Sequence, residues 1–221
     1  LILRPPDDVV HVKMRILDTE TKVNLNHQRL DRDFYAREPD VVARDLIGKI
    51  LVRVLDDVEL KGRIVEAEAY RGANDAASHA YRGTTARNAP MFGPPGHTYV
   101  YFIYGVHWMF NISAHTEASP GAVLIRALAP IAGVATMRAH RDGKPDRLLT
   151  NGPARLAQAL AIDEDLNDLD LCTSSIIYVA EGEVPPDYEV VSGPRVRVPG
   201  DEAAKARRWR FWLEDHPYVS T

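Results

Sequence analysis

The segment 63–70 constrains the fold of this chain most, because two acidic residues interrupt an otherwise strand-like run. Side chains alternate between the two faces of a β-strand. One face of this strand would carry Ile64, Glu66, Glu68 and Tyr70. A carboxylate that packs against a core loses its hydration and needs a partner. The pattern therefore indicates either a salt-bridged strand or a functional site.

The remaining segments predict a single α+β domain. The 221 residues suffice for one sizeable core, and no Gly/Ser/Pro-rich linker divides them. Expected strands are 49–55, 60–70, 98–103, 108–113, 121–128, 175–180, 188–191, 195–198 and 209–213. Expected helices start at Pro39 and Pro153; Gly48 would end the first, and Thr150 or Asn151 would cap the second. We expect a curved, mostly antiparallel sheet with flanking helices and a protruding β-hairpin.

Several global features restrict domain organisation and partners. Residues 1–28 lack clear periodicity and are interpreted as an N-terminal extension, which leaves 29–221 as the domain. The single cysteine, Cys172, excludes a disulfide framework and is typical of a reducing compartment. The eight histidines lack compact ligand spacing, so we expect no metal and no other cofactor. No apolar run could span a bilayer, so we expect no membrane contact and a cytoplasmic monomer, at the bacterial nucleoid, or a nuclear one in a eukaryote.

The charge distribution bears on nucleic acid as a partner. The net charge of −4 weighs mildly against it, since proteins that bind polyanions are commonly basic. The charges are segregated, however, with acids gathered at 163–170. Two basic groups comprise Arg138, Arg141, Lys144 and Arg147, and Arg195, Arg197, Lys205, Arg207, Arg208 and Arg210. Each group alone fits a solvated surface, but together they permit a face that contacts phosphates.

A long loop and a hairpin follow the acidic strand. Residues 71–96 form a longer connection than compact domains usually contain, and such loops are often functional. The strands 98–103 and 108–113 would meet at Tyr104, where an aromatic side chain buries little surface unless a partner covers it. A bulky wedge can enter a minor groove and fill the gap left by an extruded nucleotide. Tyr104 and a pocket of Tyr70, Tyr99 and Tyr101 together indicate base flipping.

The carboxylate pair allows more than one chemistry. A carboxylate in a partly apolar pocket can deprotonate water. Two carboxylates can serve a glycosidase, but same-face strand neighbours lie roughly 6.6–7 Å apart, a spacing that does not separate acid, base and nucleophile. One acid could instead be structural and paired with Arg63 or Arg82, which we favour for Glu66. Arg126, inside an apolar strand, needs an anionic partner if buried: Glu66, Glu68 or a DNA phosphate.

Several ordered blocks resemble the alkyladenine (3-methyladenine) DNA glycosylase family. They are Gly-Arg-Ile-Val-Glu-Ala-Glu-Ala-Tyr at 62–70, Tyr-Val-Tyr-Phe-Ile-Tyr-Gly at 99–105, Asn-Ile-Ser at 111–113, Leu-Ile-Arg-Ala-Leu at 124–128, Asn-Gly-Pro at 151–153 and Gln-Ala-Leu-Ala-Ile at 158–162. The resemblance runs from about residue 30 to the C-terminus. Several blocks in matching order are far more specific than one short motif.

The resemblance implies a role for each matching residue. Glu68 would be the general base that activates the water attacking C1′ of the flipped nucleotide, with Arg126 near that water and the phosphate. The base pocket would comprise Tyr70, His79, Tyr101 and Asn111: the tyrosines stack, His79 forms a hydrogen bond to the base, and Asn111 disfavours guanine. Tyr104 would intercalate. We add candidate DNA-backbone contacts, which are Arg87, Arg141, Lys205 and Arg207.

The resemblance also implies a reaction. Double-stranded DNA with alkylated or deaminated purines would be the substrate, and hydrolysis of the N-glycosidic bond would leave an abasic site. A cationic base such as 3-methyladenine leaves as a neutral molecule, so positioning and electrostatic support supply most of the catalysis. Lys61 borders the acidic strand but has the opposite parity. We therefore expect a monofunctional enzyme without Schiff-base lyase chemistry.

Two other function classes remain open. A non-catalytic nucleic-acid-binding module would keep the basic groups and the aromatics without needing Glu68 as a base. A metal-dependent nuclease would use Glu66, Glu68 and Asp75 as oxygen ligands. At the level of single residues, His79 could be a satisfied loop histidine, and Asn111 could hold a turn by bonding to the backbone.

Overall fold

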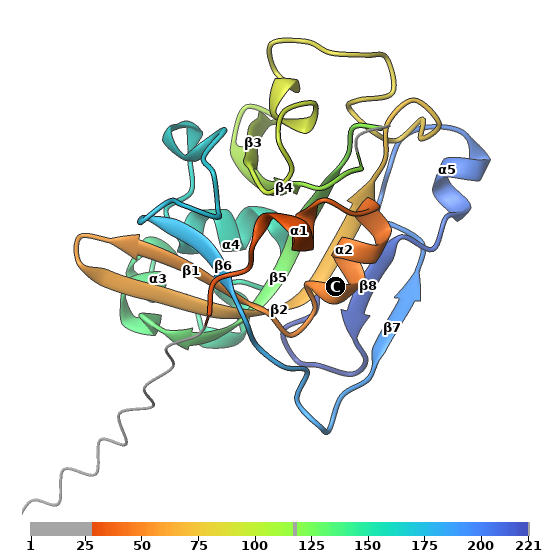
Figure 1. Ribbon diagram of the computed structural model, residues 1–221. Coiled ribbons are helices and arrows are strands. Elements are labelled where there is room, and N and C mark those ends of the chain that lie inside the picture. The colour runs from red at the N-terminus through yellow and green to blue at the C-terminus, as the bar shows by residue number, and fades with distance from the viewer. Residues whose placement is uncertain (1–27, 117–118, 221) are drawn as a thin grey trace, which may run out of the picture.

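The computed structural model describes residues 28–116 and 119–220, so the expected extension at 1–28 lies, apart from residue 28, outside the described residues. Its strands are β1 (Ile50–Leu55), β2 (Val58–Tyr70), β3 (Thr98–Ile103), β4 (His107–Ser113), β5 (Ala122–Ala132), β6 (Ile177–Ala180), β7 (Val190–Gly193) and β8 (Arg210–Leu213). Its α-helices are α1 (Arg32–Tyr35), α2 (Pro39–Asp45), α3 (Val134–His140), α4 (Pro153–Ala159) and α5 (Glu202–Ala206). The predicted α+β architecture with a mostly antiparallel sheet is confirmed (Figure 1).

One long strand, β2, organises the sheet. The strand order is β3-β4-β5-β2-β1-β6, and β8 pairs with both β2 and β7. On one edge β2 pairs with β5; on the other it pairs first with β1 and then, at Glu66, Ala67 and Glu68, with β8. The two acids therefore lie at the centre of the sheet, where side chains are shielded from water.

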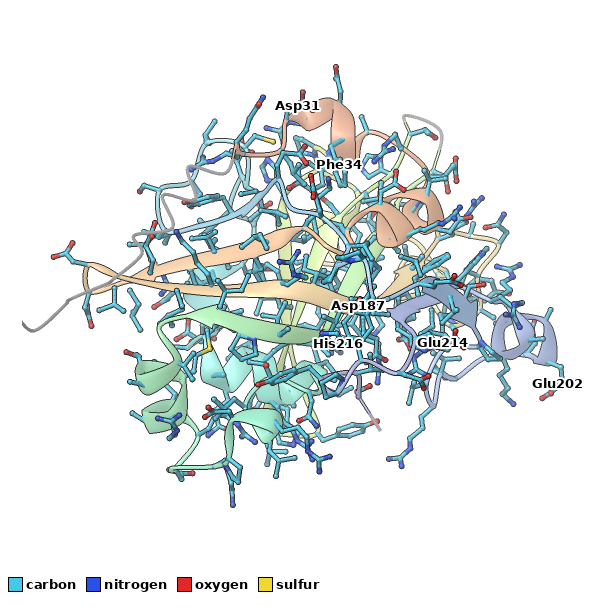
Figure 2. All side chains as sticks on the ribbon, turned by 90° about the horizontal axis from the view of Figure 1, so that it is seen from below. Asp31, Phe34, Asp187, Glu202, Glu214 and His216 are labelled. Carbon is cyan, nitrogen blue, oxygen red and sulfur yellow. The ribbon has the colours of Figure 1, made fainter. Side chains whose placement is uncertain are left out.

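Helices cover both sides of the sheet. Figures 1 and 2 show α1 and α2 on one side and α3 and α4 on the other. Helix α2 packs against β2, β5 and β8, and α4 packs against β4 and β5. Fully buried residues on these helices or directly after them include Val42 and Leu46 on the first side, and Leu156 and Leu160 on the second. Burial of each such side chain stabilises the fold by about 1.5–3 kcal/mol.

Most elements agree with the sequence-based predictions. The hairpin of β1 and β2 turns at Asp56 and Asp57, both with positive φ, as the right-handed twist of paired strands favours. Helix α2 starts at Pro39, and Gly48 beyond its end has φ +94°, a conformation that costs glycine little. Strand β7 begins at Val190 rather than at residue 188.

Two predictions are wrong, and two helices were not predicted. Residues 195–198 form no strand, because the backbone N–H of Val196 donates to the Glu68 carboxylate and Arg197 has φ +51°. Neither Thr150 nor Asn151 caps α4. The cap is Gly152, while the Thr150 hydroxyl donates to the carbonyl of Leu128 at 2.6 Å. Helices α3 and α5 were not anticipated, since their short, alanine-rich segments carry weak periodicity.

No helix in the described part of the chain is both long and apolar enough to cross a membrane.

Candidate active site

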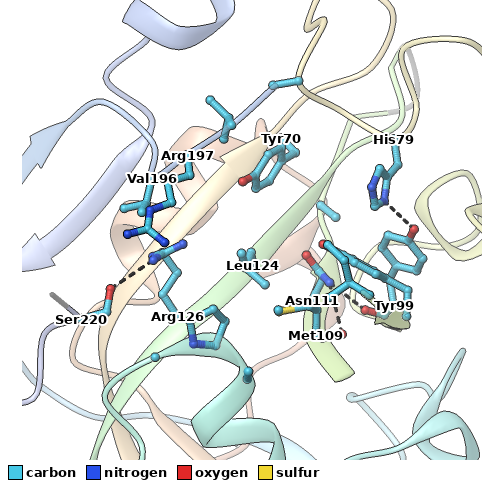
Figure 3. Close-up of a pocket in the computed structure, with 18 of the residues that line it drawn as sticks. Tyr70, His79, Tyr99, Met109, Asn111, Leu124, Arg126, Val196, Arg197 and Ser220 are labelled. Atoms are coloured by element: carbon cyan, nitrogen blue, oxygen red, sulfur yellow. Dashed lines mark hydrogen bonds between the residues drawn. The ribbon is translucent and has the colours of Figure 1, made fainter. Parts of the chain in front are cut away.

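A cavity of about 700 Å³ opens between β2, the β3–β4 hairpin and the start of α4. This volume falls within the range of pockets that take small organic molecules. Figure 3 shows Arg126, Arg197 and Ser220 on one side of the cavity, and His79, Tyr99 and Asn111 on the other. Of the residues predicted for the base pocket, the structure brings Tyr70, His79, Tyr101 and Asn111 together in its lining, with Tyr104 at its edge.

Three aromatic rings form one wall. Tyr99 and Tyr101 point to the same face of β3, with ring centroids 5.1 Å apart, and His79 meets the Tyr101 ring edge-on at 4.7 Å. Burial raises the pKa of Tyr101 to about 12 and that of Tyr99 further. Burial and the charge of Arg87 lower the pKa of His79. The wall is therefore uncharged at neutral pH, as stacking on a nucleobase requires.

The loop that carries His79 is internally braced. The His79 ring accepts or donates one hydrogen bond, from Nδ1 to the Tyr99 hydroxyl at 2.8 Å. The side chain of Asn88 donates to the carbonyls of His79, at 2.8 Å, and Gly83, at 3.0 Å, and accepts from Thr85. Sequence reasoning missed Asn88, because a buried asparagine that ties a loop together has no short-range signature.

Asn111 lies across the cavity from Tyr70. It pairs with Tyr99 in the β3–β4 ladder, and its side-chain amide donates to the Tyr99 carbonyl at 3.0 Å. The interpretation that Asn111 holds a turn is wrong, since it lies inside β4. With its amide nitrogen bonded to the backbone, the amide oxygen remains the group with which Asn111 can meet a ligand.

Glu66 is a structural acid. Its carboxylate is fully buried and accepts from Arg126 Nε at 2.8 Å and Arg210 Nε at 2.7 Å. The backbone N–H of Ser220, at 2.7 Å, and the Ser220 hydroxyl, at 2.9 Å, also donate to it. The favoured structural role is thus correct, but the suggested partners Arg63 and Arg82 are not. Three of these donors meet Oε1 and one meets Oε2, and Glu66 is not among the residues that line the cavity, so its contacts are structural.

Glu68 lies directly beneath the cavity wall. Its side chain is fully buried and does not reach the cavity surface. One oxygen, Oε2, accepts from the Tyr70 hydroxyl at 2.8 Å and lies 3.3 Å from Arg126 Nη1. The other, Oε1, accepts from the Val196 N–H at 2.6 Å. Tyr70, Arg126 and Val196 all line the cavity, and a carboxylate offers about four acceptor positions, so Oε1 retains one.

Arg126 joins the two acids. It bonds to Glu66 through Nε, approaches Glu68 through Nη1, and donates from Nη2 to the Ser220 hydroxyl at 3.1 Å. Both of the protein partners considered for Arg126 are therefore present. Ser220 was not foreseen, because it is 94 residues from Arg126 and no local pattern marks it.

A second buried ion pair anchors the loop after β2. Arg195 and Asp75 are both fully buried, with Arg195 Nη1 and Nη2 at 2.7 and 2.8 Å from the two Asp75 oxygens. Arg195 also lies over the Tyr70 ring at 4.7 Å. Asp75 thus does not join Glu66 and Glu68, which removes the predicted ligand set of a nuclease. Within residues 28–116 and 119–220, no three acidic, histidine or cysteine side chains are placed to hold a metal.

The candidate backbone-contacting residues occupy different positions. Arg87 donates to the Phe102 carbonyl at 3.1 Å beside the aromatic wall, and Arg207 lies over the Trp209 ring at 4.5 Å. Lys205 pairs with Glu202 on exposed α5. Burial and the charge of Arg155 lower the pKa of Arg141. Two arginines of the C-terminal basic group form ion pairs with buried acids: Arg195 with Asp75, and Arg210 with Glu66.

The tip of the β3–β4 hairpin projects Tyr104 into solvent. Tyr104 and Gly105 both have positive φ, and the N–H of Val106 donates to the carbonyl of Ile103 at 3.2 Å, which closes a tight two-residue turn. The Tyr104 side chain is 84% exposed. A tyrosine with positive φ costs about 1–2 kcal/mol relative to glycine, so the fold holds this ring at the tip against its backbone preference.

Comparison with known proteins places this constellation in a family. The model of the methylpurine-DNA glycosylase family matches residues 33–217, which is most of the chain and includes every cavity residue except Ser220. The chain belongs to the methylpurine-DNA glycosylase family. The resemblance inferred from the sequence blocks is thereby confirmed.

Curated members of the methylpurine-DNA glycosylase family match over almost their whole length. A Carboxydothermus hydrogenoformans protein named "Putative 3-methyladenine DNA glycosylase" is 47% identical over 191 residues, covering 86% of this chain and 98% of its own. A Clostridium botulinum protein of the same name is 44% identical over 201 residues, covering 87% and 98%.

Proposed function

We propose that this protein is a monofunctional DNA glycosylase that flips alkylated or deaminated purines out of duplex DNA and hydrolyses their N-glycosidic bond. The observation that carries the proposal is the position of Glu68 in a member of this family. Its carboxylate touches Tyr70, Arg126 and Val196, and all three line one aromatic cavity. An acid so placed can act on a ligand in the cavity once water enters beside it.

The proposed mechanism uses Glu68 as general base. A water bound at the remaining acceptor position of Glu68 attacks C1′ of the extruded nucleotide, and its proton passes to the carboxylate. The C1′–N bond breaks, and its electron pair leaves with the base. Positive charge develops on the sugar in the transition state, and the negative Glu68 stabilises it. Arg126 holds the carboxylate in place through their 3.3 Å contact.

Base recognition is proposed to come from the aromatic side chains of the cavity and from Asn111. Tyr70 and Tyr101 would stack against a purine, and His79 would form a hydrogen bond to it. The Asn111 side chain, held by its bond to the Tyr99 carbonyl, narrows the site beside the base and would disfavour the exocyclic amino group of guanine. A purine made cationic by alkylation needs no proton donor to depart, which suits a cavity that has no acid in its described lining.

Product analysis on duplex oligonucleotides tests the proposed function. Each duplex carries one defined lesion, either 3-methyladenine, 7-methylguanine, hypoxanthine or ethenoadenine, and an undamaged duplex serves as control. We expect free base and an abasic strand from at least one lesion, no strand cleavage, and full activity in EDTA. Loss of activity with EDTA would support a metal-dependent nuclease. Binding without any product would support a non-catalytic module.

The hairpin tip gives a separate prediction about DNA capture. Tyr104→Ser should weaken binding to a duplex with a tetrahydrofuran abasic site roughly 5- to 150-fold, because stacking of one base on an aromatic ring contributes about 1–3 kcal/mol. The melting temperature should stay near that of the wild type, since the ring is 84% exposed. Fluorescence anisotropy and thermal unfolding measure the two quantities.

Tyr178→Ser is the matched control for the hairpin variant. Tyr178 is on β6, at the opposite end of the sheet from β3, where Arg29 covers its ring at 4.4 Å. We expect this control to bind the same duplex as the wild type does. Unchanged binding by Tyr104→Ser would remove the intercalating role.

A further inference from the structure

Arg197 is an exposed cation at the mouth of the cavity to which the sequence blocks assign no role. Its side chain contributes to the cavity lining although the residue is exposed. Figure 3 shows it on the same side of the cavity as Arg126 and Ser220. Among the residues that the structure describes, it forms no ion pair and its guanidinium donates no hydrogen bond, unlike its neighbours Arg195 and Arg210.

The backbone holds Arg197 in a conformation that side chains with a Cβ rarely adopt. Its φ is +51°, where glycine would fit without steric cost. The preceding N–H, that of Val196, donates to Glu68 Oε1 at 2.6 Å, and the buried Arg195 is clamped to Asp75. These two contacts determine where the segment runs. The guanidinium of Arg197 is therefore attached at a defined place relative to the Glu68 carboxylate.

The positive charge around the mouth of the cavity favours an anionic ligand. Three arginines line the cavity, Arg126, Arg155 and Arg197, and its described lining contains no acidic side chain. Arg126 is compensated by Glu66 and Glu68. Arg155 is bonded only to a neutral group, the side chain of Asn151 at 2.8 Å, and to the Asn151 carbonyl at 3.4 Å. Neither Arg155 nor Arg197 thus has an acidic partner among the described residues, and Arg197 is the more exposed of the two.

We propose that Arg197 binds a DNA phosphate beside the extruded nucleotide, and does so only when that nucleotide occupies the cavity. The inference rests on the proposed function. A nucleotide carries a phosphate on each side of its sugar, so placing C1′ at Glu68 brings those phosphates to the mouth where Arg197 lies. A guanidinium offers the planar donor fork that phosphate oxygens favour. Arg197 would thereby hold the sugar against the water that Glu68 activates.

Salt-dependent binding of two duplexes tests the proposal. Wild type, Arg197→Gly and Arg197→Lys are compared on a duplex with one tetrahydrofuran abasic site and on the same duplex undamaged. The slope of log K against log salt is negative, and loss of one phosphate contact decreases its magnitude by about 0.9. We expect that decrease, with roughly tenfold weaker binding at low salt, for Arg197→Gly on the tetrahydrofuran duplex alone. Arg197→Lys should keep the slope of the wild type, because the charge remains.

Arg44→Ala is the matched control, because Arg44 is an exposed arginine on α2, on the other side of the sheet from α4. It should leave both slopes unchanged. Arg197→Gly should melt no lower than the wild type, since glycine accepts the positive φ. An unchanged slope on the tetrahydrofuran duplex, or an equal decrease on both duplexes, would overturn the proposal.

The two proposals fail separately. Base release by the wild type is measured in parallel on the defined-lesion duplexes. If the wild type releases base but Arg197→Gly has the same salt slope as the wild type, the proposed phosphate contact is refuted and the proposed glycosylase function stands. If Arg197→Gly decreases the magnitude of the salt slope but the wild type releases no base, the proposed glycosylase function is refuted and Arg197 remains a phosphate-binding residue.

Discussion

Glu68→Gln is expected to lower the single-turnover rate of base release by roughly 10²–10⁴-fold, the range that a positioned general base contributes. Glutamine has the same shape but cannot accept the proton of the attacking water and cannot offset the positive charge on the sugar. The Val196 N–H can still donate to its amide oxygen, so the cavity should keep its form. Affinity for the tetrahydrofuran duplex should remain within a few-fold of the wild type.

A matched control comes from the same strand. Glu59 is on β2, is half-exposed and pairs with Lys61 at 2.6 Å, away from the cavity. Glu59→Gln should release base at the rate of the wild type. A Glu68→Gln enzyme with wild-type turnover would exclude Glu68 as the base, and a loss of DNA binding in step with activity would point to a structural role.

Glu66→Gln is expected to act on stability instead. The change leaves Arg126 and Arg210 facing a neutral amide in a buried site, and removal of one partner from a buried ion pair costs about 3–5 kcal/mol. For a domain of this size that corresponds to a decrease in melting temperature of about 6–20 °C. Thermal unfolding followed by circular dichroism measures it.

Comparison of the two acids makes this second prediction specific. Glu68→Gln should melt closer to the wild type, because Arg126 keeps its partner Glu66 and Oε1 had only one donor. If Glu66→Gln melts at the temperature of the wild type, the cluster around Glu66 does not stabilise the fold as its geometry indicates. If it keeps stability but loses base release, the division of roles between the two acids is reversed.

The fold was largely predictable where local signals were strong. The turn at Asp56 and Asp57 and the proline at the start of α2 each act over a few residues, and both predictions are confirmed. Glu66 and Glu68 both contact Arg126, although the pairing of β2 with β5 is irregular on either side of Glu66. The segment 195–198 misled because its alternation of arginine and valine resembles a strand. In the structure, the Val196 N–H instead donates to the Glu68 carboxylate, and the Arg195 side chain forms a buried ion pair with Asp75. Both partners are distant in sequence, so local periodicity does not encode these contacts.

The cavity residues were found in the sequence only in part. Tyrosines at alternate positions of β3, an exposed aromatic at a hairpin tip and a histidine in a long loop are visible patterns, and all lie at the cavity. Asn88, Ser220 and Arg155 were missed. Asn88 and Ser220 each form several hydrogen bonds, and Arg155 lines the cavity, but none of the three has an unusual neighbourhood along the chain.

Strand parity was readable from the order of residues alone, because the two-residue period of a β-strand is a local property: it put Glu66 and Glu68 on one face of β2. Tertiary packing decides that Glu66 is neutralised and that Glu68 remains beside the cavity. The groups that donate hydrogen bonds to Glu66 belong to Arg126, Arg210 and Ser220, which are 60, 144 and 154 residues away along the sequence. Contacts over such separations form when β5, β8 and the C-terminal segment pack around β2, so no local sequence pattern predicts them.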